Sequence, residues 1–181
     1  MASGAHEPTS STDDSAYPQP FEPLLPQRFL SEVKDPLVGA LTLRTGDRDL
    51  AEDLAQETIA RALANWERVS EMANPTGWMY RVGFNLAASH WRRLAIGVRA
   101  ERGAAESTSF QLHTAEDMVV RDSLARLSRR QQEVIILRFY LGFSVAQVAE
   151  TLGVAQGTVK TQTHRALKHL RIELEDSHGV D

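Results

Sequence analysis

The segment 152–170, LGVAQGTVKTQTHRALKHL, contains the side chains best suited to contact a polyanion. Lys160, Arg165 and Lys168 carry its formal charges, and the segment has no carboxylate. Amide and hydroxyl side chains stand between these cations, and such groups can hydrogen-bond to base edges while the cations hold phosphates. The chemistry favoured here is therefore binding of nucleic acid.

The surrounding residues predict two helices joined by a tight turn. Ser144 followed by Gln147 forms a capping-box pattern, and Gly153 is suited to end the helix that the box starts. After a turn over 153–155, a second helix from about Gln156 resembles the second helix of a helix-turn-helix, which enters the major groove. Its polar side carries Gln156, Thr158, Lys160, Thr161, Gln162 and Arg165. The alternative is an ordinary helical hairpin with a solvated face.

Composition restricts the remaining possibilities. The 181 residues include no cysteine, which excludes disulfides, thiol catalysis and Cys-ligated zinc. No apolar run reaches the roughly 18 residues that span a bilayer, and the N-terminus lacks the basic-then-apolar order of a signal peptide, so we expect a cytoplasmic protein without membrane insertion. Strand patterns are almost absent, so the predicted fold class is all-α. We expect no metal site, because His164 and His169 lie off a common helix face.

The net charge of −4 is unevenly distributed along the chain. Residues 1–26 contain four acids and no Lys or Arg, whereas the remaining 155 residues hold 20 acids and 20 bases. Residues 81–102 and 160–171 each sum to +4, and residues 46–71 sum to −4. Any electrostatic function therefore resides in these blocks rather than in the net charge.

The composition also divides the chain. We expect a disordered acidic tail over 1–26, a helical domain over 27–95 and a flexible linker over 96–115. A second helical domain should cover 116–176, with 177–181 as a disordered end. Just before the second domain, Thr114 is a candidate helix cap. Within the domain, a second capping-box pattern, Ser128 with Gln131, precedes an apolar helix that Gly142 ends. The two helical domains would be a three-to-four-helix bundle and a four-helix unit.

Residues 46–66 form an amphipathic helical pattern with an acidic side. The apolar side consists of Ala51, Leu54, Ala55, Thr58, Ala62 and Trp66. The polar side consists of Asp49, Glu52, Asp53, Gln56 and Glu57. This side is either an ordinary solvated face or a docking surface for a basic protein.

Residues 74–93, NPTGWMYRVGFNLAASHWRR, begin a helix in which Asn74 caps and Pro75 takes the first position. One apolar stripe contains Trp78, Met79, Val82 and Leu86. A second contains Tyr80, Phe84, Ala87 and Trp91, beside the polar stripe of Arg81, Asn85 and Arg92. The second stripe is either core or a surface on which single-stranded bases stack.

The order of AEDLAQE, the segment 74–93, a linker and LSRRQQEVIILRFYLGFSVAQVAETLGVAQGTVKTQTHRALKHLR is similar to a bacterial RNA polymerase sigma factor. The closest type is the extracytoplasmic-function (ECF, group 4) type of the sigma-70 superfamily, and the resemblance covers residues 28 to about 174. It implies sigma domain 2 over 28–95 and sigma domain 4 over 116–174. The implied function is promoter-specific transcription initiation, with no catalytic residue and no cofactor.

The resemblance also implies partners and site residues. Core RNA polymerase, through its beta and beta-prime subunits, would dock on Asp49, Asp53, Leu54, Gln56 and Glu57. The −10 element would be opened and read by Arg68, Asn74, Tyr80, Arg81, Asn85, His90, Arg92 and Arg93. The −35 duplex would be read by Ser144, Gln156, Thr158, Lys160, Thr161, Gln162 and Arg165. An anti-sigma factor is a further candidate partner.

Two positions depart from the family pattern, since Ala155 stands where a Ser is frequent and Ser89 stands where an Asp is frequent. Two other classes of protein compete with this interpretation. A DNA recombinase would need a catalytic domain, which the sequence lacks. A conventional DNA-binding regulator would dimerise and bind a palindrome without polymerase.

Overall fold

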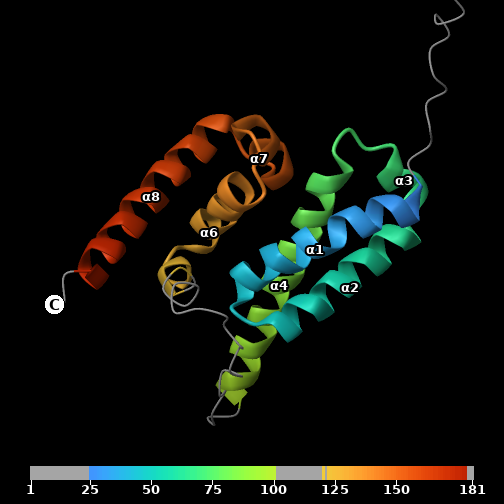
Figure 1. Cartoon of the computed structure of the whole chain (residues 1–181). Helices are drawn as coiled ribbons and strands as arrows, with labels where there is room; N and C mark the ends of the chain where they lie inside the picture. Colours follow the sequence, from blue (N-terminus) through green and yellow to red (C-terminus); the bar gives the residue numbers. More distant parts are fainter. Residues whose placement is uncertain (1–24, 101–119, 121, 179–181) are drawn as a thin grey trace, which may run out of the picture.

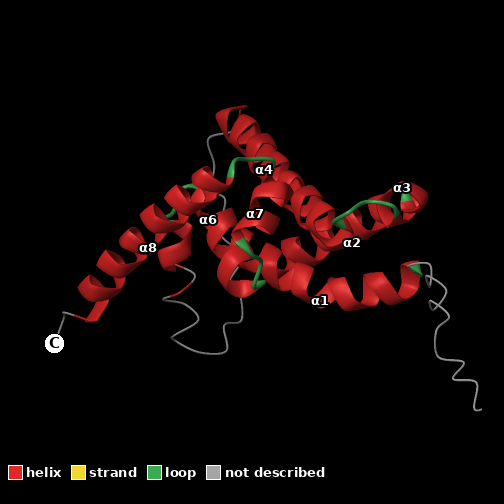
Figure 2. Ribbon diagram, turned by 90° about the horizontal axis from the view of Figure 1, so that it is seen from above, coloured by secondary structure: helices red, strands yellow, loops and turns green. Residues whose placement is uncertain are grey.

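The computed structural model describes residues 25–100, 120 and 122–178, and the regular elements within these ranges are all helices (Figure 2). The predicted all-α class is confirmed. The first half contains α1 (Pro26–Thr45), α2 (Arg48–Ala64), α3 (Trp66–Ser70) and α4 (Pro75–Ala100). The second half contains α6 (Arg129–Ile135), the π-helical turn η1 (Ile136–Tyr140), α7 (Val145–Leu152) and α8 (Gln156–His178), and Figure 1 shows the two halves side by side. None of the described helices is long and apolar enough to cross a membrane.

The first half is a bundle in which α1, α2 and α4 pack on one another. Pro26 takes the first position of α1, where its missing N–H costs nothing. Gly46 ends the helix in a left-handed conformation at φ 74°. The buried face of α1 includes Leu37 and Leu41, which meet the buried Met79 and Phe84 of α4 in one apolar cluster.

The second half follows the local signals of the sequence closely. Both capping boxes are present, since Ser128 pairs with Gln131 and Ser144 pairs with Gln147, and each pair exchanges two hydrogen bonds. Gly153 ends α7 in a left-handed conformation at φ 64°. The apolar helix predicted before Gly142 is present as α6 followed by η1.

The π-helical turn is a feature that the sequence pattern does not predict. The Leu141 N–H donates to the Ile136 carbonyl, five residues earlier, at 3.1 Å. Such turns are rare and each widens the helix by one residue. Here the buried Leu137 faces the core, while Phe139 and Tyr140 are about half exposed.

The larger of two apolar clusters is shared between the halves, whereas a smaller cluster consists of second-half residues, namely Leu124, Leu127, Ile135 and Ala166. One continuous apolar cluster joins α1, α2 and α4 to η1 and α7, and it contains Tyr80 and Phe84 together with Leu137 and Val148. Gly39 makes room for this packing, because a Cβ placed there would lie 1.9 Å from the Tyr140 hydroxyl oxygen. The halves therefore meet through side chains that exclude water.

The last helix of the first half runs into the segment predicted to be a linker. Helix α4 continues to Ala100, through the first residues of the segment 96–115 expected to be a linker. Helix formers such as Leu94, Ala95 and Ile96 extend the helix, and no glycine in the left-handed conformation stops it before Ala100. The remainder of that segment up to Val120, including the candidate cap Thr114, lies outside the described residues, as does the tail up to residue 24.

Candidate functional site

The N-terminal part of α8 presents an open polar face. The helix begins directly after the turn from Gly153 to Ala155, as a helix-turn-helix requires. Val159 and Ala166 are fully buried against α7 and α6 and fix the helix in place. The remaining predicted residues lie on the outside: Ser144, Gln156, Thr158, Lys160, Thr161 and Arg165 are exposed, and Gln162 is half-buried.

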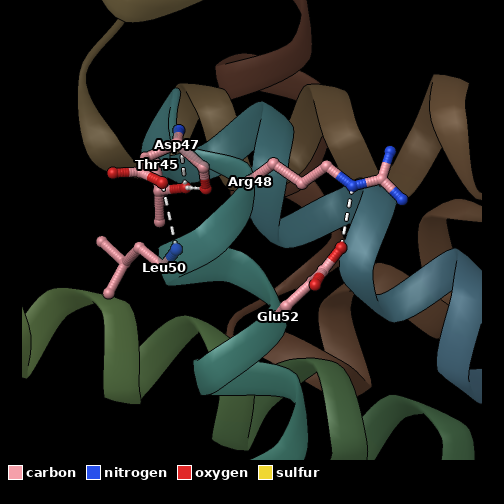
Figure 3. A network of polar contacts seen from close by, with 5 residues as sticks. All are labelled: Thr45, Asp47, Arg48, Leu50 and Glu52. Atoms are coloured by element: carbon pink, nitrogen blue, oxygen red, sulfur yellow. Dashed lines mark hydrogen bonds and ion pairs between the residues drawn. The ribbon is translucent and has the colours of Figure 1, made fainter. Parts of the chain in front are cut away.

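The acidic face of α2 lies on a different surface of the molecule. Asp47 caps the helix, because its carboxylate accepts a hydrogen bond from the Leu50 N–H at 3.0 Å (Figure 3). The Thr45 hydroxyl accepts from the Asp47 N–H at 3.2 Å and tightens the turn out of α1. These contacts fix where α2 begins, and burial of Ala51, Ala55 and Thr58 fixes the rotation of the helix about its axis.

That rotation exposes most of the predicted docking residues. Asp49, Asp53, Gln56 and Glu57 are exposed. Glu57 pairs with Arg61 at 2.8 Å, and Glu52 pairs with Arg48 at the same distance. Leu54 requires a correction, because it is only 7% exposed and belongs to the apolar cluster. Its side chain stabilises the bundle and is not part of the acidic face.

The start of α4 is fixed by Asn74, as predicted. Its side-chain Oδ1 accepts from the Gly77 N–H at 2.7 Å, and Pro75 is the first helical residue. The predicted −10 residues fall into three groups of exposure. Arg68, Arg81, Asn85, Arg92 and Arg93 are exposed, Asn74 and His90 are half-buried, and Tyr80 is buried.

Tyr80 is buried in this structure. It is 2% exposed, and its ring meets Phe143 edge-on with centroids 5.6 Å apart. Burial raises the pKa of its hydroxyl to about 12, with a smaller contribution from Tyr140. In this conformation Tyr80 is core, so it reaches DNA only when the segment carrying Phe143 moves away.

The rest of the aromatic stripe is divided between core and surface. Phe84 and Ala87 are buried, whereas Trp91 is 37% exposed beside His90, with ring centroids 5.8 Å apart. The two alternatives for this stripe therefore apply to different parts of it. Only its C-terminal end, next to Arg92 and Arg93, offers an aromatic ring for stacking on an unpaired base.

A buried polar contact between the halves has no signal in the sequence. Arg44 of α1 is 6% exposed, and its Nη1 donates to the Gln132 side-chain oxygen of α6 at 3.0 Å. Burial lowers the pKa of Arg44, while nearby Glu133 acts in the opposite direction. Helical periodicity does not predict this contact, because Arg44 and Gln132 are polar residues at buried positions, where periodicity predicts apolar side chains.

Among the described residues, no three His, Asp or Glu side chains come close enough to hold a metal ion. The surface formed by α8 suits duplex DNA, and the surface formed by α2 suits a basic protein.

Comparison with known proteins identifies the family of this chain. Residues 29–95 match the family model of sigma-70 region 2, and residues 117–170 match that of sigma-70 region 4. The chain is 37% identical over 139 residues to the ECF RNA polymerase sigma factor SigL of Mycobacterium tuberculosis, covering 73% of this chain and 78% of that one. It is 32% identical to the RNA polymerase sigma-E factor of Streptomyces coelicolor, covering 82% and 85% of the two chains.

A solved structure is similar across both halves. It is the sigma factor RpoE in complex with the anti-sigma factor NepR from Bartonella quintana, with a TM-score of 0.74 and 28% identity. The similarity covers 82% of this chain and 96% of that one. From these matches, the chain belongs to the ECF RNA polymerase sigma factors, which direct promoter-specific transcription initiation by RNA polymerase.

Proposed function

We propose that this sigma factor docks core polymerase through the acidic face of α2, defined by Asp49, Asp53, Gln56 and Glu57. The polar N-terminal face of α8 then reads the −35 duplex, and α4 with the loop before it opens and reads the −10 element. The observation that carries this proposal is the exposure of the α8 face on a buried helix-turn-helix scaffold. The chain itself is non-catalytic, acts in the cytoplasm with the polymerase, and contacts its beta and beta-prime subunits.

Reading both elements requires the two halves to separate. The −35 and −10 positions are about 25 base pairs apart, which is about 85 Å of B-form DNA at ~3.4 Å per base pair. In the structure, Asn74 at the start of α4 lies 3.3 Å from Glu150 in α7. A chain in this conformation cannot contact both elements of one promoter.

An anti-sigma factor is a further partner under this proposal. The similar sigma factor from Bartonella quintana was crystallised with one. The competing possibility of a conventional regulator predicts promoter binding without polymerase, by a dimer on a palindrome.

Run-off transcription with core polymerase over a genomic promoter library tests the proposal. We expect transcripts whose templates share a −35 and a −10 element, and only when both core and this chain are present. Gel filtration and DNA binding without core provide the contrast. Specific binding by a dimer in the absence of core would contradict the proposed dependence of promoter recognition on core polymerase.

A further inference from the structure

Gly157 is a helical glycine that the fold itself does not require. It is the second residue of α8 and is exposed. A Cβ at this position would meet no neighbouring atom within 4 Å, and the residue is not among the glycines with a left-handed backbone. Alanine would therefore fit here without strain. Glycine destabilises the folded chain relative to alanine at such a position, because it leaves the unfolded chain more flexible.

Two other glycines inside helices have a packing reason that Gly157 lacks. A Cβ at Gly39 would lie 1.9 Å from the Tyr140 hydroxyl oxygen, and a Cβ at Gly77 would lie 2.5 Å from the Asn74 side-chain nitrogen. Alanine at either position would displace a neighbouring side chain. At Gly157 the corresponding space opens to solvent, so a reason for a bare backbone there lies outside this chain.

Gly157 lies on the side of α8 that points away from the core. Val159 is fully buried. Because an α-helix turns by about 100° per residue, Gly157 and Thr161, two positions before and after Val159, both point about 200° away from it. Both residues are exposed, and their spacing of four makes them neighbours on the helix surface. This line of the helix would enter a DNA groove most deeply.

Thr161 presents an apolar group beside the bare backbone. Its hydroxyl donates to the Gly157 carbonyl at 2.9 Å. This bond uses the single hydrogen of the hydroxyl and holds the oxygen against the helix, which leaves the methyl group on the outer side. Exposed Lys160 and Arg165 flank the pair and suit phosphates. The apolar group that base pairs present in the major groove is the C5 methyl of thymine.

We propose that Gly157 and Thr161 receive one thymine methyl of the −35 duplex, with Gly157 leaving room for the base-pair edge and Thr161 making the apolar contact. The inference rests on the proposed −35 role of α8 and adds Gly157 to the residues that determine its specificity. A side chain at position 157 would occupy the volume of the base edge. It therefore stabilises the free protein and weakens the complex with DNA.

Gly157→Ala separates these two effects, because they have opposite signs. The urea midpoint of the full chain should rise. Run-off transcription with core polymerase, on a template that the wild type uses, should fall about tenfold or more because the added methyl group collides with the base edge. Co-purification with core should be unchanged, since the docking face lies on α2. A lower urea midpoint, or undiminished transcription, would overturn the proposal.

The thymine methyl is tested with deoxyuridine, which pairs as thymine does but lacks the C5 methyl. Each thymine of the −35 element is replaced in turn. One replacement should lower transcription by the wild type about fourfold, through loss of one buried methyl contact. Thr161→Ser keeps a hydroxyl for the Gly157 carbonyl and removes the methyl, so it should transcribe the two templates equally.

Thr163→Ser is the matched control for the loss of a threonine methyl. The Thr163 hydroxyl makes the same kind of bond, to the Val159 carbonyl at 2.8 Å, but this residue is half-buried and lies off the outermost line of α8. It should keep the fourfold difference between thymine and deoxyuridine. The thymine contact is excluded if no replacement affects the wild type, or if Thr161→Ser keeps the same difference.

Failure of the proposed −35 role has a different signature. In that case the wild type itself transcribes templates with an intact and a scrambled −35 element equally. If only the present inference fails, the wild type keeps its −35 dependence, and Gly157→Ala and Thr161→Ser behave like the wild type on every template.

Discussion

Asn74 links the two halves through Glu150 while capping its own helix. Its Oδ1 accepts from the Gly77 N–H at 2.7 Å, and its Nδ2 donates to the Glu150 carboxylate at 3.3 Å. One amide side chain thus begins α4 and contacts α7. The two roles use different atoms, so substitutions can separate them.

Asn74→Ala should lower the free energy of unfolding by about 1 kcal/mol, because the helix loses its cap. Asn74→Asp keeps an oxygen acceptor for the Gly77 N–H but sets a second carboxylate against Glu150. We therefore expect Asp to preserve more stability than Ala and to open the inter-half contact. Urea unfolding measures the change in stability. The reaction of a maleimide with a cysteine introduced at position 151, where Thr151 is buried, measures the opening of the inter-half contact. Wild-type behaviour of both variants in both assays would exclude the dual role.

Charge reversal on α2 should separate docking from folding. Glu57→Lys loses an exposed pair with Arg61, which contributes about 0.5 kcal/mol or less. Affinity for core polymerase should fall about tenfold or more, and further when Asp53→Lys is added, because like charges then meet across the interface. Co-purification with core polymerase measures docking, and circular dichroism measures whether the variant is folded.

Glu32→Lys is the matched control for this prediction. Glu32 forms an exposed pair with Arg28, four residues away on α1, at 3.3 Å. Its reversal removes the same kind of contact outside the proposed docking face. Undiminished core binding by the α2 variants, or equal loss in the α1 variant, would remove the docking assignment.

Within α8, Gln162→Ala and Lys160→Ala should have different effects on −35 recognition. An amide that contacts a base edge discriminates by ~1 to 3 kcal/mol, whereas a phosphate contact carries no sequence information. Gln162→Ala should change which −35 sequences are used, and Lys160→Ala should weaken all of them by a similar factor, more so at high salt. A −35 library transcribed at two salt concentrations tests this, with the exposed Lys168→Ala as the charge-matched control. If Gln162→Ala scales every promoter equally, Gln162 is not a base reader.

Glu133 should give the stability a component that depends on pH. Burial raises the pKa of its carboxyl above the ordinary 4.5, although Arg130, Arg44 and Arg129 act in the opposite direction. The folded state therefore binds the proton more tightly than the unfolded state does. The contribution is fully present below pH 4.5 and is lost as the pH rises through the raised pKa.

The measurement is the difference in unfolding free energy between the wild type and Glu133→Gln, followed by urea unfolding from about pH 4 to 7. The wild type should lose stability relative to the variant as the pH rises, and the difference should level off above the raised pKa. Other carboxylates cancel because both proteins contain them. A difference that is constant over this range would contradict the prediction.

The sequence predicts the local structure well where the signal is itself local. The capping boxes at Ser128 and Ser144, the Asn74 cap and the left-handed Gly153 depend on residues a few positions apart, and all are present. The exposed acidic face of α2 follows from helical periodicity in the same way.

The remaining features depend on contacts between residues far apart in the chain. Tyr80 is equally suited to a core or a stacking surface, and the edge-on contact with Phe143 makes it core. The family resemblance assigns Leu54 to docking, whereas its periodic position places it on the apolar side, where it is buried. The pairing of Arg44 with Gln132 spans 88 positions and leaves no trace in the spacing of either residue.

The close approach of Tyr140 to Gly39 has an evolutionary consequence. A methyl group at this position would lie 1.9 Å from the Tyr140 oxygen and 2.8 Å from Cζ of the same ring, so the two positions share one volume. A descendant that acquires a larger residue at position 39 keeps the close packing only if a smaller residue replaces Tyr140 or the Tyr140 ring rotates outward. Substitutions at these two sites, in halves proposed to read different DNA elements, are therefore expected to occur together across lineages.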